Sequence, residues 1–404
     1  MKTKIGYFVP EFPGQTHMFF WREVNALKEY DIEPDFVSSR LPPSKIISHV
    51  WSREAQQKTT YLFPPTHYLV GALTELLRSG PLGWLSCLKA ALTAKGVPFS
   101  TKIRLLALAF PGSQLAYLAR TRGWRHVHVH SCADSANIAM FAKLISGLPY
   151  SLTLHGSLED YGPNQEQKWQ AAQFAIVITK KLYEEVHQQL AGYLPSVVRI
   201  APMGVDCNIF KRKTDYVPWD GTQPCRVFSC GRLNRCKGHA DLISAVVLLK
   251  KKGLQVELKI AGEDELGGSG YHKELEKLIQ QFDLEDSVHL LGAVSEEEVR
   301  EALEQVHIFA LASWHEPLGV AIMEAMAMAV PVVVSKGGGV EELVDNGVDG
   351  LLVAPKHPEA IAHAIEKILY NRQLALHMSG YSRRKIVEEF HHYKSAEVFA
   401  ECLE

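Results

Sequence analysis

The stretch Glu316-Pro-Leu-Gly-Val-Ala-Ile-Met-Glu324, with Val330-Pro-Val-Val-Val334 soon after it, combines a loop, a helix and a buried strand. Two carboxylates eight residues apart on a helix are separated by about 12 Å along its axis, or about two turns. Between them, the helix start at 318–320 offers unpaired backbone N–H groups and a positive dipole end to an anion. This pattern suits a ligand with hydroxyl groups at both ends and an anion between them, such as a nucleotide-sugar. Such spacing also arises by chance in a chain of 404 residues, so the surrounding sequence has to support the interpretation.

The composition is that of a globular protein with two domains. A chain of 404 residues exceeds the size of about 250–300 residues at which single cores stop growing. Its apolar share of 47% and charged share of 22% are ordinary for such a protein, and the net charge of −2 gives no reason to expect a nucleic acid partner. Seven cysteines without a Cys-x-x-Cys motif favour reduced thiols in a cytoplasmic compartment over disulfides or a structural zinc site.

The apolar runs of the sequence are all short. Ile5–Val9, before Pro10, has five residues, which is too few for the apolar region of a signal peptide. No uninterrupted run of 18 apolar residues occurs anywhere in the sequence. We therefore expect a soluble, cytoplasmic protein.

Short β-branched segments alternate with longer helical patterns in both halves, which predicts an α/β fold with two parallel sheets. In the first half the predicted strands are Ile5–Val9, Asp35–Val37, His126–His130, Ser151–Leu154 and Phe174–Thr179. In the second half they are Val227–Cys230, Gln255–Ala261, Val288–Leu291, Ile308–Ala312 and Val330–Val334. Because ligands bind outside the carboxyl ends of the strands in such sheets, functional residues should directly follow strands.

A basic loop follows the first predicted strand of the second half. Gly231 permits a tight turn there, and Arg232 and Lys237 lie five residues apart ahead of the next helix. Arginine supplies a fork of donors and lysine a point charge, so the pair could bracket a diphosphate. The alternative is a solvated basic loop. It is not a Walker loop, because the Gly-x4-Gly-Lys-Ser/Thr pattern is absent.

Histidines end two predicted strands of the first half. His155-Gly156 follows one of them, and the glycine would let a ligand approach the backbone closely, although a lone histidine is more often structural. His126, His128 and His130 alternate on one strand face. A metal site there is disfavoured, because no cysteine or carboxylate set accompanies them and a strand face closes a tetrahedron poorly. Only His130, at the strand end, is expected near the ligand-binding cleft between the two domains.

Two further features leave alternatives open. Gly14, in the turn after the first strand, could admit a phosphate or an acceptor, or it could be an ordinary turn glycine. The segment 76–125 carries eight positive charges and no negative charge among leucines and aromatic residues. Such a surface could lie on anionic lipid or be a solvated helical face. The aromatic and basic pattern typical of RNA-binding proteins is absent.

The ordered motifs resemble those of the family 4 retaining glycosyltransferases of the GT-B fold. The motifs that carry the resemblance are Gly231-Arg-Leu with Lys237-Gly238, Glu316-Pro-Leu-Gly with Glu324-Ala-Met-Ala, Pro331-Val-Val-Val, Glu341-Glu-Leu-Val, Gly350-Leu-Leu-Val, His128-Val-His130, His155-Gly156 and Pro202-Met-Gly204-Val-Asp206. They extend over essentially the whole chain, and Glu11-Phe-Pro13 resembles members that build exopolysaccharide or similar surface glycans. The resemblance implies two Rossmann-like domains facing each other across a cleft. Residues 1–200 would bind the acceptor, 201–384 would bind the nucleotide-sugar donor, and a helix at 385–404 would cross back onto the first domain.

The resemblance also implies roles for individual residues. Arg232 and Lys237 would bind the donor diphosphate, and Glu316 would hold a hydroxyl of the transferred sugar. His155 would lie beside that sugar and join these three as the catalytic group, while Glu324 would bind the ribose hydroxyls. The further donor-binding positions would be Gly14, Gly231, Gly262, Leu291, Leu318, Gly319 and Val320, and the acceptor side would have His130 and Gly14.

The implied reaction moves a hexose from a nucleotide-diphosphate sugar to a hydroxyl of a glycan or lipid-linked acceptor, in polysaccharide or glycolipid biosynthesis. No metal and no cofactor are expected, because the family needs no divalent ion and the nucleotide-sugar is a co-substrate. Met203 stands where the family usually has asparagine, which puts the contribution of that side chain in doubt. A front-face path is favoured, because the sequence contains no obvious carboxylate nucleophile: Glu316 is the nearest candidate, and its implied role is hydroxyl binding. The alternatives are a nucleotide-sugar epimerase or hydrolase and a non-catalytic nucleotide-sugar-binding subunit, and 76–125 suggests peripheral attachment to the inner face of the plasma membrane.

Overall fold

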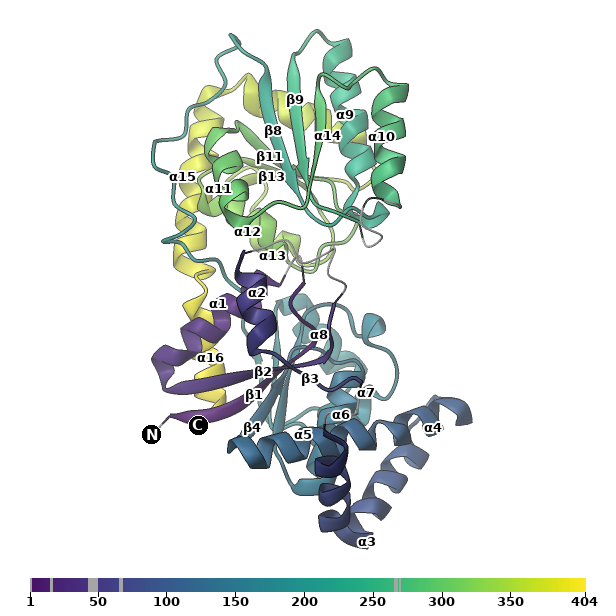
Figure 1. Ribbon diagram of the computed structural model, residues 1–404. Coiled ribbons are helices and arrows are strands. Elements are labelled where there is room, and N and C mark those ends of the chain that lie inside the picture. The colour runs from purple at the N-terminus through teal and green to yellow at the C-terminus, as the bar shows by residue number, and fades with distance from the viewer. Residues whose placement is uncertain (1, 15–16, 43–49, 65–67, 265–267, 269) are drawn as a thin grey trace.

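A computed structural model of the chain describes residues 2–14, 17–42, 50–64, 68–264, 268 and 270–404. It contains two α/β domains, one above the other, each built on a parallel sheet with helices on both faces (Figure 1). The first sheet has the strand order β3-β2-β1-β4-β5-β6-β7 and the second has the order β10-β9-β8-β11-β12-β13. The expected class, two Rossmann-like domains facing each other, is therefore confirmed.

The first domain begins with β1 in the middle of its sheet, paired with β2 on one side and β4 on the other. Its strands are β1 (Thr3–Glu11), β2 (Ile32–Arg40), β3 (Thr60–Tyr61), β4 (His126–Val129), β5 (Tyr150–Leu154), β6 (Ala175–Val177) and β7 (Val198–Ile200). Its helices are α1 (Met18–Leu27), η1 (Lys28–Tyr30), α2 (Val50–Lys58), α3 (Leu69–Thr93), α4 (Phe99–Ala107), α5 (Ala109–Arg122), α6 (Asp134–Ser146), η4 (Leu158–Tyr161), α7 (Gln165–Ala171) and α8 (Lys180–Gln189).

The second domain repeats the same alternation of strands and helices. Its strands are β8 (Cys225–Cys230), β9 (Val256–Ala261), β10 (Val288–Gly292), β11 (Ile308–Leu311), β12 (Val332–Ser335) and β13 (Gly350–Val353). Its helices are η5 (Arg235–Lys237), α9 (His239–Lys251), α10 (Tyr271–Gln281), α11 (Glu296–Gln305), α12 (Val320–Ala327), α13 (Val340–Leu343), α14 (Pro358–Leu369) and α15 (Arg372–Glu389). The predicted strands of this half all lie within one or two residues of the observed ones, and β8, β9, β11 and β12 are largely buried.

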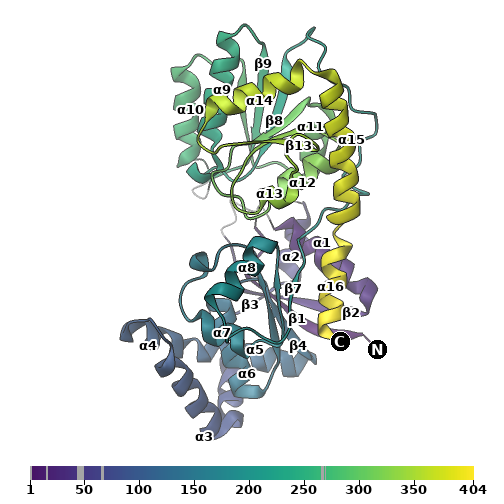
Figure 2. The same ribbon diagram turned by 180° about the vertical axis from the view of Figure 1, so that it is seen from behind.

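The chain returns to the first domain at its end, as Figure 2 shows along one side of the molecule. The boundary predicted at residue 385 falls inside α15, which continues to Glu389. Only α16 (Tyr393–Leu403) lies on the first domain, where Ala396 and Phe399 pack in one apolar cluster with Phe20 of α1. The chain thus returns to the first domain through the short segment 390–392.

Several short elements escaped prediction. Strand β3 has two residues and strand β7 has three, and they form the two edges of the first sheet. Few apolar side chains are needed to bury such short edge strands. Among the described residues, no helix is both long enough and apolar enough to cross a membrane.

Candidate functional site

A cavity of about 450 Å³ lies where the strand ends of the two domains meet. This volume is within the range of small-molecule sites, about 300–1,000 Å³. From the first domain its lining includes Glu11, His17, Phe20, His130, His155 and Tyr161. From the second domain it includes Gly231, Arg232, Lys237, Glu316, Leu318, Gly319 and Val320. Most of the predicted site residues therefore face one cavity, and Met203 lines it too.

The charged wall of this main cavity is a pair formed by Lys237 and Glu316. Lys237 ends η5, where the side chain of Asn234 accepts a hydrogen bond of 3.1 Å from its backbone N–H. Its ammonium group forms an ion pair with Oε2 of Glu316, which also accepts a hydrogen bond of 3.1 Å from the Ser313 hydroxyl. Glu316 is only 8% exposed. An anion entering the cavity would therefore meet a lysine that already has one carboxylate partner.

The beginning of α12 forms the floor beside this pair. Gly319, the residue before the helix, has a φ of 98°, and a Cβ there would lie 2.6 Å from the side chain of Ile322. The positive φ is the reason that this position needs a glycine, since the end of the Ile322 side chain could move aside. The turn leaves Leu318, Gly319 and Val320 facing the cavity at a helix N-terminus, where backbone N–H groups favour an anion.

A second, narrower cavity of about 120 Å³ adjoins the first, with Gly231, Arg232 and Val320 on the lining of both. Gly262, Ala293, Val294 and Glu324 line its far part, together with Arg22 and Glu296. Gly262 has a φ of 146° and touches the backbone of Gly231, since a Cβ there would lie 1.9 Å from that carbonyl oxygen. The predicted diphosphate and ribose positions are thus continuous in space.

Arg22 of α1, which sequence reasoning missed, reaches across to the second domain. Its Nη2 lies 2.8 Å from Oε1 of Glu324 and 2.5 Å from Oε2 of Glu296. Burial raises the pKa of Glu324, while the nearby Arg22 charge opposes that shift. Nε and Nη1 of the buried Arg22 have no hydrogen-bond partner among the described residues. Glu324 is therefore held by an arginine of the other domain, whose remaining donors are buried without a hydrogen-bond partner among the described residues.

The histidines of the first domain form a buried chain that ends at the main cavity. Nδ1 of His130 lies 3.1 Å from Nε2 of His155, and Nε2 of His130 lies 3.2 Å from Oε2 of Glu23. The Tyr7 hydroxyl also donates to that Glu23 oxygen. The His130–Glu23 contact is not a hydrogen bond, and Nδ1 of His155 has no hydrogen-bond partner among the described residues, so one ring nitrogen of His155 is unused. His155 could thus accept a hydrogen bond from a hydroxyl group.

His126 and His128 lie deeper in the same sheet and are satisfied without a metal. Nε2 of His126 and Nδ1 of His128 each lie 2.7 Å from the Ser151 hydroxyl. Nε2 of His128 lies 2.8 Å from the hydroxyl of Thr153. These bonds explain the alternating histidines as a hydrogen-bonded part of the core.

We predict that His155 stays neutral throughout the usual assay range. Burial and, to a smaller extent, the neighbouring His130 lower the pKa of His155 to about 3, against the charge of Glu23, which raises it. A histidine with a lowered pKa is neutral above that pKa, so its ring nitrogens should show no titration between about pH 5 and pH 8. Two-bond ¹⁵N–¹H spectra of the free protein measure this directly. A His155 ring signal that moves near pH 6.5 would contradict the prediction.

Two predicted donor-binding residues are not brought to either cavity. Leu291 is 41% exposed and points away, while Ala293 and Val294, just after the end of β10, line the narrow cavity instead. Gly14 packs against the imidazole of His17, and it is His17 that reaches the main cavity. In both cases the predicted loop is close to the site, but a residue two or three positions later provides the contact.

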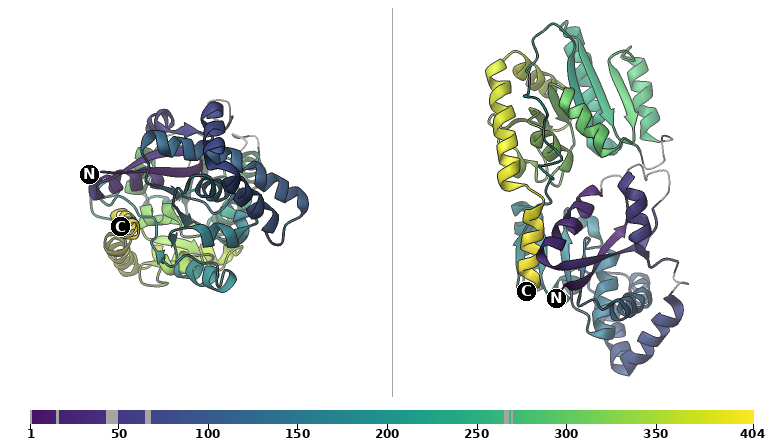
Figure 3. Two further views of the ribbon diagram at one scale, coloured as in Figure 1. Left: turned by 90° about the horizontal axis from the view of Figure 1, so that it is seen from below. Right: turned by 60° about the vertical axis from the view of Figure 1, so that its left-hand side comes forward.

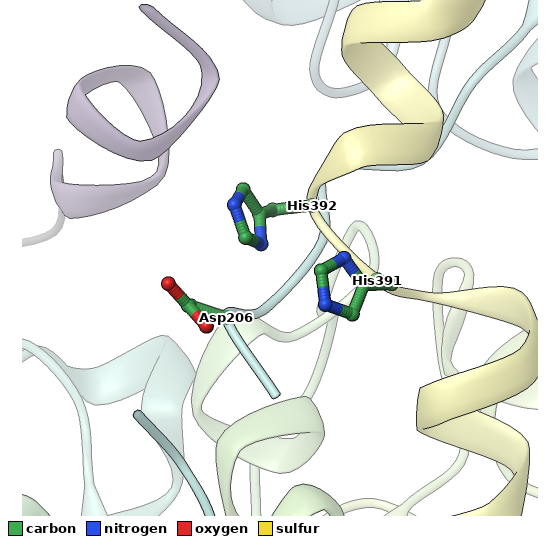
Figure 4. A group of neighbouring side chains, drawn as sticks. All are labelled: Asp206, His391 and His392. Atoms are coloured by element: carbon green, nitrogen blue, oxygen red, sulfur yellow. The ribbon is translucent and has the colours of Figure 1, made fainter. Parts of the chain in front are cut away.

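Among the described residues, Asp206, His391 and His392 form a group that could hold a metal ion, because one ligand atom of each lies within 4.8 Å of the others (Figure 4). The group lies at the crossing between the domains, where Val205 pairs with His391. Oδ1 of Asp206 already accepts backbone hydrogen bonds, and Nδ1 of His391 accepts one of 3.4 Å from Tyr393. In the neutral tautomer that accepts at Nδ1, Nε2 carries the proton and is no metal ligand. These bonds engage Asp206 and His391, whereas Nδ1 of the buried His392 has no hydrogen-bond partner among the described residues.

Comparison with known proteins agrees with this geometry. A family model described as "Glycosyl transferases group 1" matches residues 220–385. WcaL of Salmonella typhimurium, which is named as a colanic acid biosynthesis glycosyltransferase, is 29% identical over 385 residues, covering 89% of each chain. Alpha-D-kanosaminyltransferase of Streptomyces kanamyceticus is 31% identical over 277 residues, which cover 63% of this chain and 70% of that protein.

The fold is also that of known structures. The Anabaena protein HepE, solved in complex with UDP, superimposes with a TM-score of 0.72 at 18% sequence identity, covering 100% of this chain and 99% of that one. At this low identity the likeness establishes the architecture only. The chain is thus similar to glycosyltransferases in sequence and to a nucleotide-binding protein of the same architecture in fold.

Proposed function

Because the chain belongs to the glycosyl transferases group 1 family, we propose that it transfers a hexose from a nucleotide-diphosphate sugar to an acceptor hydroxyl in glycan biosynthesis. In this proposal the anomeric configuration is retained, no divalent metal takes part, and the acceptor is a glycan or a lipid-linked sugar. The observation that carries it is the main cavity, where Arg232, Lys237 and the start of α12 surround space for a diphosphate next to Glu316 and His155.

The donor fits the two cavities in one orientation. The diphosphate would lie by Arg232 and Lys237, whose charges oppose its own. The ribose would then reach Glu324 in the narrow cavity, and the base would lie along Gly262 and Val294. The sugar would extend the other way, toward Glu316 and His155.

Catalysis in this proposal depends on stabilising charge at the leaving group. As the bond between the anomeric carbon and the phosphate oxygen breaks, negative charge grows on the phosphate beside Arg232 and Lys237. The acceptor oxygen bonds to the anomeric carbon from the same face, and its proton passes to the departing phosphate. Oε2 of Glu316 is engaged by Lys237 and Ser313, which favours a binding role for that carboxylate over nucleophilic attack. A glycosyl adduct trapped on Glu316 would contradict this front-face path.

The first test is a panel of UDP-, GDP- and ADP-sugars, with and without chelator, following nucleotide release and thermal shift together. We expect one donor to stabilise the protein and to release nucleotide at a rate that the chelator leaves unchanged. Glu316→Gln should abolish release, whereas the exposed Glu359→Gln, in the same domain, should not.

The outcomes separate the proposal from its alternatives. Acceptor-dependent release with a retained product anomer supports it. Free sugar that accumulates without any acceptor dependence indicates a hydrolase, and an isomerised donor without nucleotide release indicates an epimerase. Stabilisation without any turnover, with acceptors present, indicates a non-catalytic subunit. Loss of activity on chelation would overturn the metal-independent part alone.

Peripheral attachment to the inner face of a plasma membrane is the further part of the proposal. A lipid-linked acceptor resides in a membrane, so an enzyme that uses one gains from binding the surface. The basic segment 76–125 suggested this attachment from the sequence.

A further inference from the structure

The helices α3 and α4 form an arm that projects from the first domain (Figure 3). Twelve of the 26 large apolar side chains that are exposed among the described residues lie on it, within 69–107. They are Leu69, Val70, Leu73, Leu77, Leu82, Trp84, Leu85, Leu88, Leu92, Phe99, Ile103 and Leu106. Contiguous exposed apolar surface of this kind marks an interaction site in a soluble fold.

The arm has small residues against the protein and large apolar residues on its outer face, which is the reverse of an ordinary surface helix. The α3 residues that face the protein are mostly small: Gly71, Ala72, Gly83, Cys87 and Ala91 are buried. The outward residues are the large ones, and Leu82 is 80% exposed. Outward leucines recur at helical spacing as Leu82, Leu85, Leu88 and Leu92, which puts them on one face. An ordinary surface helix would show its polar face to water here.

The kink in α3 divides this surface into two parts. Gly80 has a φ of 60° ahead of Pro81, which interrupts the helix. Leu69, Leu73 and Leu77 therefore form one apolar stripe before the kink, and Leu82–Leu92 form a second one after it. Phe99, Ile103 and Leu106 add a third stripe on α4.

The charged residues around the stripes are positive. Fewer of the basic residues of 76–125 lie on this surface than the sequence suggested. Helix α5 is mostly buried, and Arg120 at its end pairs with the buried Glu75, so this part of 76–125 belongs to the body of the domain. On the arm, Arg104 and Lys95 pair with acids of neighbouring elements. Arg78 and Lys89 are exposed, and no acid lies between residues 76 and 107. The membrane surface predicted for 76–125 is thus narrowed to α3 and α4.

We propose that the α3–α4 arm (69–107) inserts its leucine face into the headgroup and acyl boundary of a bilayer that contains anionic lipid. An anionic bilayer is the partner that fits both properties of the arm. Its large apolar side chains partition into the boundary between headgroups and acyl chains, and Arg78 and Lys89 attract negative headgroups. The inference identifies the surface behind the membrane part of the proposed function. It rests on the proposed function only for the biological reason to bind a membrane. Lipid binding itself needs neither the sugar donor nor the acceptor.

The test is flotation of the full chain with vesicles of phosphatidylcholine alone or mixed with phosphatidylglycerol, at low and high salt. We expect binding that rises with phosphatidylglycerol and falls with salt. Leu82→Ser combined with Leu85→Ser should weaken binding by about tenfold or more. The matched control, Val217→Ser combined with Tyr370→Ser, changes exposed apolar residues of the second domain and should have no effect.

Charge and depth are tested separately. Arg78→Gln combined with Lys89→Gln should weaken binding to phosphatidylglycerol vesicles by about 30-fold, since each cation contributes about 1 kcal/mol and about 1.4 kcal/mol is a factor of ten. Lys273→Gln combined with Lys277→Gln, two exposed lysines of α10, is the control. Trp84 fluorescence should shift to the blue on binding and be quenched by brominated lipid, and Trp84→Phe should remove that component.

Two results would overturn the proposal. One is an absence of flotation with phosphatidylglycerol vesicles at low salt. The other is a dimer, measured by sedimentation without lipid, that Leu82→Ser with Leu85→Ser converts to monomer, because a second copy would then cover the arm. Each leaves the glycosyl transfer assay unaffected, so the arm and the reaction can fail independently.

Discussion

Lys237→Met is expected to lower kcat for sugar transfer by about 100- to 1,000-fold, the usual cost of removing one donor that stabilises a developing anion. The Lys237 ammonium lies on the cavity wall where the proposed leaving phosphate would gain charge. Methionine keeps the length and apolar stem of the side chain and removes only the charge and its hydrogen bonds. The measurement is kcat and KM for the donor identified by the panel, and most of the loss should be in kcat, because the charge matters most in the transition state.

The ion pair between Lys237 and Glu316 makes a second effect of this substitution predictable. Without Lys237, the largely buried Glu316 loses its cation, so Lys237→Met should also lower thermal stability. Combining it with Glu316→Gln removes the uncompensated charge and should recover most of that stability, while activity stays absent. If Lys237→Met lost stability but kept its kcat, Lys237 would have a structural role only.

The second domain is the part of the site that the sequence predicts best. Arg232 follows β8 by two residues, and Glu316 follows β11 by five residues, so strand recognition and the rule for parallel sheets place both. Lys237 and Glu324 lie on or beside the helices that follow those strands. The positions of these four residues depend on local secondary structure, and the sequence pattern predicts that structure.

The contribution of the first domain depends on packing between distant segments, which a local pattern does not contain. Arg22 meets Glu296 and Glu324 across 274 and 302 positions of sequence. A buried arginine within the apolar pattern of α1 has no local signature. The same reason explains why 76–125 was taken as one basic surface. The pairing of Arg120 with Glu75 is visible only when α3 and α5 lie side by side.

Arg22→Met is expected to destabilise the fold by about 3–5 kcal/mol, the cost of breaking a buried ion pair from one side. Arg22 and Glu324 have side chains that are 5% and 13% exposed, and Glu296 faces the same guanidinium. The substitution would leave two carboxylates together in a buried cavity without a cation. Chemical denaturation of the parent and variant at neutral pH measures the difference in the free energy of unfolding.

The pH dependence of this loss identifies its cause. Burial raises the pKa of Glu324 above its ordinary value of 4.5, and removing Arg22 removes the charge that opposes the shift. A carboxyl group whose pKa is higher in the folded state binds its proton more tightly there, so stability is lost as pH rises through the interval above 4.5. The extra loss in Arg22→Met should therefore be complete at neutral pH and should narrow as pH falls toward 4.5. Adding Glu324→Gln to Arg22→Met should remove most of this pH dependence. A deficit that is equal at all pH values would instead assign it to lost packing of Arg22 on Phe210.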